Sequence, residues 1–305
     1  GLYFVLLFGA VNLFADFSYE GARSVSGPYL AALGATGLIV GTVGGLGEFL
    51  GYALRLISGR WADSSHRYWL ITGLGYLLQM TVIPLLALAG SWQVAAALMV
   101  LERTGKATRN PPRDVMLSEA GTHMGRGWAF GINEALDQIG AFLGPLAVAA
   151  INSLHHDYKL AFAWLAVPGA AVLLLVFTAR LRFPYAGKIR RDPTSLHTTG
   201  YPAIFWWYAA GAGLVAFGFA DYALIAFHFA KSHAVPQAAI PIVYAFGMLA
   251  GGAGALGFGK LYDRYGLIVL VPATVATALF APLVFLGGEA AAIAGVLLWG
   301  LGLGV

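Results

Sequence analysis

Two short patterns each occur twice in the sequence: FADF at residues 14–17 and FADY at residues 219–222, and GRWAD at residues 59–63 and GKLYD at residues 259–263. The spacing is also nearly repeated, because 47 residues separate Asp16 from Asp63 and 42 separate Asp221 from Asp263. Internal repetition at matching distances predicts a protein made of two equivalent halves.

The composition predicts that the chain lies in a membrane. Of its 305 residues, 59% are hydrophobic and only 10% are charged, whereas about 25% of a typical soluble domain is charged. Ten apolar stretches have a length suited to spanning a bilayer. They cover residues 1–24, 36–58, 68–89, 92–109, 128–152, 160–179, 203–229, 237–257 and 267–287, and a tenth begins at residue 290. Cysteine is absent, and we expect neither a metal site nor a cofactor.

The basic residues predict the orientation in the membrane. Thirteen of the 18 Lys and Arg residues lie after the second, sixth and eighth stretches or from the end of the fourth stretch to the start of the fifth, which places those loops in the cytoplasm of a bacterial inner membrane. The net charge of +4 follows from this topology, so we expect no nucleic-acid partner.

The connector around residues 182–201 is the natural domain boundary, because it is polar, basic and rich in turn-forming residues. It divides residues 1–181, an N-terminal six-helix half, from residues 202–305, a second half with four helices. Both ends of the chain lie inside apolar runs, so we expect a fragment that lacks some chain at each end. We expect it to act as a monomer.

The charged residues inside the stretches are the first candidates for a site, because a charge facing lipid is costly. Stretches three, six and nine have no ionisable residue at their centres and should be peripheral. Asp16, Glu20 and Arg23 share one helix face. Two close carboxylates cannot both ionise cheaply in a low-dielectric site, so one should hold a proton. We expect Arg23 to pair with Glu20, which leaves Asp16 to titrate; a purely structural ion cluster is the alternative.

The other intramembrane candidates are Glu48, Glu134, Asp137, Asp221 and His228. Asp221 and His228 share a helix face, and a histidine titrates near neutral pH. The alternatives without a functional role are that His228 is a packed histidine and that Glu134 is solvated. We expect the carboxylates to point into the protein.

Four stretches resemble the major facilitator superfamily, with bacterial efflux-type permeases most similar: NLFADFSYE at residues 12–20, LGAT at 33–36, ERTGKATRNPPRDVML at 102–117, and RGWAFGINEALDQIGAFLGP at 126–145. The paired Gly-x-x-x-Asp motifs add to the resemblance. It implies an all-α membrane bundle with two pseudo-symmetric six-helix halves, of which about ten of twelve helices are present here. It also implies secondary active transport of a small organic solute, and no enzymatic activity.

The resemblance implies roles for further residues. The residues of the gating loops would be Gly59, Asp63, Arg67, Gly259, Asp263 and Arg264. Arg109, Arg113 and Asp114 would lie at a rigid corner where Pro111 and Pro112 end a helix. The corner side chains would pair with the Gly-x-x-x-Asp loop. Arg103 corresponds to a membrane arginine of drug–proton antiporters. Gly140 and Gly144 would admit a closely packed helix, and Pro145 would bend its own helix.

The most favoured function is proton-coupled efflux by antiport, in which protons, a small solute and the lipid bilayer are the partners. Proton-coupled uptake of a sugar or organic acid is the alternative, and a receptor or scaffold that transports nothing is an alternative of another class. The sequence contains no nucleotide-binding or hydrolase motif, which argues against an ATP-driven pump.

Overall fold

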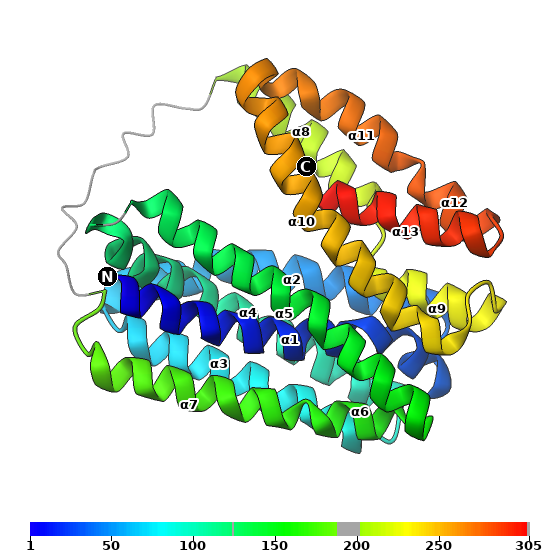
Figure 1. Ribbon diagram of the computed structural model, residues 1–305, viewed down its shortest axis with the longest axis horizontal. Coiled ribbons are helices and arrows are strands. Elements are labelled where there is room, and N and C mark those ends of the chain that lie inside the picture. The colour runs from blue at the N-terminus through cyan, green and yellow to red at the C-terminus, as the bar shows by residue number, and fades with distance from the viewer. Residues whose placement is uncertain (124, 188–201, 304–305) are drawn as a thin grey trace.

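The computed structural model describes residues 1–123, 125–187 and 202–303, and these form helices and no strand (Figure 1). The α-helices are α1 (Leu2–Ala32), α2 (Gly37–Ser65), α3 (Tyr68–Leu85), α4 (Trp92–Ala120), α5 (Arg126–His155), α6 (Tyr158–Trp164), α7 (Ala166–Arg182), α8 (Ala203–Gly218), α9 (Tyr222–Ser232), α10 (Ile240–Tyr265), α11 (Leu270–Ala278), α12 (Phe280–Leu286) and α13 (Glu289–Leu303). The all-α membrane bundle expected from the sequence is confirmed.

In the described part of the chain, six helical stretches are long and apolar enough to cross a membrane: Leu2–Ala32, Gly37–Ser65, Tyr68–Leu88, Trp128–His155, Tyr158–Arg182 and Gln237–Tyr262. Helix α4 has the length, but it also carries charged residues along its middle. Three expected spans are each divided in two, as α6 and α7, α8 and α9, and α11 and α12.

Several helices continue beyond the ends expected from the sequence. Helices α2 and α10 run to Ser65 and Tyr265, so both Gly-x-x-x-Asp motifs lie in final helical turns and not in loops. Pro111 and Pro112 do not end α4. Pro111 lacks the N–H that would bond the carbonyl of Ala107, four residues earlier. The Ser58 hydroxyl donates to Ala107 O at 2.8 Å, so α2 supplies the missing hydrogen bond.

Most buried hydrophobic side chains of the described residues belong to two cores. Helices α1–α7 enclose the larger core, and α9, α10, α12 and α13 enclose most of the second. We call α1–α7 the first group and α8–α13 the second group. Helices α3 and α7 lie on the side of the first group away from the second, and α11 lies on the far flank of the second group (Figure 1). Most of the predicted linker lies outside the described residues.

The two groups touch mainly at one end of the bundle. We call the end with Arg60, Arg67 and Arg182 the basic end, and the end with residues 33–36 and 233–236 the opposite end. Near the opposite end, α9 packs on α1 and α2, while α10 packs on α1 and α5. The side chains of α8 towards the basic end are almost all exposed.

Gly27 makes the contact between α1 and α9 possible. A Cβ at this position would overlap the backbone of Ala223, which cannot move aside as a flexible side chain would. We expect Gly27→Val to keep the two groups apart at the opposite end. The chain has no cysteine, so spin labels on Ala32→Cys and Lys231→Cys report the separation. The mean label distance should rise in Gly27→Val and stay unchanged in Gly45→Val, where the added Cβ meets no atom within 4 Å.

Candidate functional site

Asp221 lies in a break between α8 and α9. Residues 219–221 are not helical, and the Asp221 side chain caps α9 by accepting from the Ala223 N–H at 2.9 Å. Aspartate is a favoured N-cap residue, and the positive end of a helix dipole stabilises its charge. The Trp299 indole donates to the Ala220 carbonyl at 2.9 Å, which satisfies a backbone group that the break exposes. The matching FADF pattern around Asp16 remains helical within α1.

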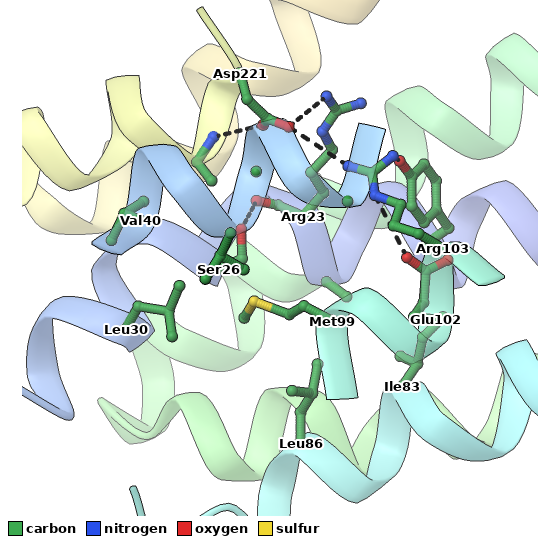
Figure 2. A pocket seen from close by; sticks show the side chains of 16 residues that line it. Arg23, Ser26, Leu30, Val40, Ile83, Leu86, Met99, Glu102, Arg103 and Asp221 are labelled. Atoms are coloured by element: carbon green, nitrogen blue, oxygen red, sulfur yellow. Dashed lines mark hydrogen bonds and ion pairs between the residues drawn. The ribbon is translucent and has the colours of Figure 1, made fainter. Parts of the chain in front are cut away.

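Two arginines of the first group hold this carboxylate (Figure 2). Asp221 Oδ2 lies 3.2 Å from Arg23 Nη2 and 3.5 Å from Arg103 Nη2. The same arginines contact Glu48 of α2, at 3.2 Å from Arg23 and 2.9 Å from Arg103. Four charges from α1, α2, α4 and the α8–α9 break thus form one ion cluster that joins the two groups.

A cavity opens beside this cluster. One wall is charged and holds Arg23, Arg103, Asp221 and Glu102. The rest is largely apolar and includes the side chains of Leu30, Val40, Ile83, Leu86 and Met99 (Figure 2). Tyr19 also lines it, and its ring lies beneath the Lys106 ammonium, 3.7 Å from the ring centroid. The cavity therefore offers a charged surface and an apolar surface to one small molecule.

A second polar site lies in the interior of the first group. Asp16 is 7% exposed, and its carboxyl is within hydrogen-bonding reach of the half-buried Asp137 on α5. Arg109, which is 1% exposed, places Nη2 3.8 Å from Asp16 Oδ1. Its hydrogen bonds go to Gln79 and Tyr76 of α3. Two carboxyl groups and one arginine therefore share a buried site.

Gly140 and Gly144 bring α5 against α1 at this level. A Cβ at either glycine would overlap the α1 backbone, at Leu13 for Gly140 and at Phe17 for Gly144. Close backbone approach is the usual reason for small residues between membrane helices. Pro145 lies inside α5, which continues past it to His155.

The predicted pairing of Arg23 is wrong because its partners come from other parts of the chain. Arg23 pairs with Glu48 and Asp221, not with Glu20, whose carboxylate accepts from the Tyr244 hydroxyl of α10. The His228 ring packs on Phe285 of α12, with 5.1 Å between the ring centroids. Glu134 is exposed and accepts from Gln138 Nε2 at 2.9 Å.

The expected corner of gating residues is also different. Arg109 is buried in the first group and is not in a loop. Arg113 bonds Asp114 and Asn12, while Asp63 accepts from Tyr68 at 3.0 Å. Arg67 is exposed at the basic end, and Arg264 lies over the Tyr265 ring. The side chain of Asp263 and the surroundings of Gly259 lie outside the described residues.

Sequence reasoning missed uncharged polar residues. Asn12, Tyr76 and Gln79 are buried and bond the charged groups of α4. A lone amide such as Gln79 in an otherwise apolar span was the available signal, because a buried amide needs partners. Among the described residues, no group of three or more His, Asp or Glu side chains is placed to hold a metal ion.

The comparisons with known proteins agree with this architecture. The model of the Major Facilitator Superfamily matches residues 8–305. The chain belongs to the major facilitator superfamily. The Mycobacterium tuberculosis protein Rv2265 is 40% identical over 309 residues, covering 99% of this chain and 76% of that protein. The MFS-type transporter MJ1317 of Methanocaldococcus jannaschii is 33% identical over 188 residues, covering 61% of this chain and 47% of that protein.

Solved structures of the superfamily share the fold. The crystal structure of the nucleoside transporter NupG superposes with a TM-score of 0.74 at 14% identity, covering 99% of this chain and 79% of that one. A bacterial homologue of the human lysosomal transporter Spinster, in an inward-facing and unoccupied conformation, superposes with a TM-score of 0.68 at 19% identity. The match covers 98% of this chain and 74% of that one. The family and the fold are those of multi-pass secondary transporters.

Proposed function

We propose that this member of the major facilitator superfamily is a proton-coupled efflux transporter that exchanges protons for a small organic solute by alternating access. The observation that carries the proposal is the contact between Asp16 and Asp137. Two carboxylates in contact within a low-dielectric interior repel each other, so binding one proton between them relieves the repulsion. Arg109 then balances the remaining negative charge.

The cavity beside the ion cluster is our candidate for the solute site. Arg23, Arg103 and Asp221 would orient a polar or charged group, while Leu30 and Met99 would contact an apolar body. Binding sites of this kind combine an apolar lining with a few placed polar groups. The proposed solute is therefore a small amphipathic organic molecule.

Alternating access needs two bodies that move against each other around a central site. We propose that residues 1–181 and 202–305 are these bodies, with residues 182–201 as a cytoplasmic linker in a bacterial inner membrane. Gly59, Asp63, Arg67, Gly259, Asp263 and Arg264 at the basic end are proposed to take part in gating. The protein is proposed to act as a monomer.

Efflux is preferred to uptake because of α5. Its Gly140, Gly144 and Pro145 resemble a Gly-Pro pattern that is associated with antiporters of the family, and both glycines pack on the α1 backbone next to Asp16. This arrangement places the α1–α5 contact and the proposed proton site in one region. Uptake by symport would use the same carboxyls with the solute moving in the same direction as the proton.

The test uses inside-out membrane vesicles that contain the full chain and have an acidic interior, with a pH-sensitive dye. Amphipathic amines, carboxylates and neutral solutes are added outside one at a time. An antiporter imports its solute into the vesicle as protons leave, so at least one solute should collapse the pH gradient in vesicles with the protein only. Solute entry without any proton exit would contradict antiport, and dependence on solute preloaded inside would favour symport.

A further inference from the structure

Gln79 of α3 connects the two polar sites through both ends of its amide. Its side chain is 0% exposed. The amide oxygen accepts from Arg109 Nε at 2.6 Å, and the amide nitrogen donates to Glu102 Oε1 at 2.6 Å. Both bonds involve a charged partner, and such hydrogen bonds are the stronger ones in proteins.

The chemistry of its partners permits only one orientation of this amide. The Arg109 guanidinium has donors and no acceptor, so the amide oxygen must face it. The amide nitrogen then faces Glu102, whose carboxylate accepts. A flipped amide would bring two donors together beside Arg109 and two acceptors together beside Glu102. The Gln79 amide is therefore held in one orientation between Arg109 and Glu102.

The two ends of this connection lead to different sites. Beyond Arg109 lies Asp16, at 3.8 Å, which contacts Asp137. Beyond Glu102 lies Arg103, whose Nε is 3.8 Å from Glu102 Oε2 and whose Nη2 is 3.5 Å from Asp221 of the second group. The connection thus runs from the proposed proton site to the ion cluster that joins the two groups.

We infer that Gln79 is a positioning residue that couples the charge of the Asp16–Asp137 pair to the contact between Arg103 and Asp221. The inference rests on the proposed function, because it requires the pair to bind a proton. When the charge of the pair changes, the pull on Arg109 changes with it. Gln79 passes this change to Glu102, which competes with Asp221 for Arg103.

Other charged groups also face this connection. Lys106 and Arg113 of α4 lie near the carboxyl pair, and Lys106 also lies near Glu102. Glu20 of α1 lies near Asp16 and Glu102, and it is bonded to Tyr244 of α10. These groups set the background field. They remain unchanged in every variant of the test, so a loss of response in a Gln79 variant comes from the connection itself.

The test measures the separation of the two groups as pH changes, and it needs no known solute. The full chain carries spin labels on Ala32→Cys and Lys231→Cys, and label distances are recorded at about pH 5 and about pH 9, a range over which buried carboxyls titrate. In the parent protein we expect the populations of short and long distances to differ between the two pH values. Gln79→Leu should populate the same distances with no dependence on pH.

Two further variants make the result decisive. Gln93→Leu removes an exposed glutamine of α4 and should respond to pH as the parent does. The variant Gln79→Met removes both hydrogen bonds and keeps nearly the length of the side chain. It should lose the pH response as Gln79→Leu does, and it decides the matter if Gln79→Leu does not fold.

The possible outcomes separate the two proposals. If the parent responds to pH and folded Gln79→Leu responds equally, the inference about Gln79 is wrong while proton coupling stands. A folded Gln79→Met that responds as the parent does also overturns the inference. If the parent shows no response, the inference is wrong, while proton coupling is decided separately by the vesicle assay.

Discussion

Asp16→Asn is expected to abolish the proton dependence of transport while the protein still folds. The amide has nearly the shape of the carboxyl, but it cannot gain and lose a proton, so the pair with Asp137 loses its exchangeable charge. Proton exit driven by a solute from inside-out vesicles should fall by more than about tenfold, equivalent to about 1.4 kcal/mol. Asp137→Asn should produce the same loss, because both residues belong to one site.

Asp157→Asn is the matched control for this result. Asp157 is exposed at the opposite end and caps α6 by accepting from the Lys159 N–H at 2.8 Å, which an asparagine can also do. The control should transport as the parent does. If purified, folded Asp16→Asn keeps an unchanged dependence on the pH gradient, Asp16 is structural and the proposed proton site is wrong.

The second large effect is expected from Gly144→Val, which acts on stability. The new side chain would overlap the carbonyl group of Phe17, and a helix backbone cannot yield as a side-chain tip can. Helices α1 and α5 would have to separate along much of their contact. Overpacking typically lowers the free energy of unfolding by about 1–3 kcal/mol. We expect a clash with backbone atoms to lower it by the upper value or more.

Thermal unfolding of the purified protein in one detergent gives the measurement. Gly144→Val should lower the midpoint temperature by several degrees or yield no folded protein, and Gly140→Val should behave alike. Gly131→Val is the control on the same helix, because a Cβ there meets no atom within 4 Å. Equal midpoints for Gly144→Val and Gly131→Val would show that the close approach of α1 and α5 does not stabilise the fold.

The membrane class, six of the ten expected spans and the α5 glycine stripe could be predicted from the sequence. Hydrophobicity over about 20 residues is a local property, so each span can be recognised without knowledge of its neighbours. Gly140 and Gly144 lie four residues apart, so helical geometry places them on one face wherever the helix packs. The structure confirms that this face meets another backbone.

Local sequence did not predict how α4 and the α8–α9 pair are built. Two prolines favoured a helix end after Arg109, but Ser58 of α2 donates to Ala107 O and α4 continues to Ala120. The FADF and FADY patterns looked equivalent, yet one is helical and the other contains a break. In both cases a hydrogen bond from a distant residue accompanies the observed backbone.

The pairing of charges was decided by tertiary structure alone. Spacing on α1 placed Glu20 within reach of Arg23, but the arginine binds Glu48 and Asp221, which are 25 and 198 residues away. Sequence spacing determines only which side chains share a face of one helix. A buried charge pairs with the opposite charge that helix crossing brings closest, and that crossing depends on the packing of all the helices together.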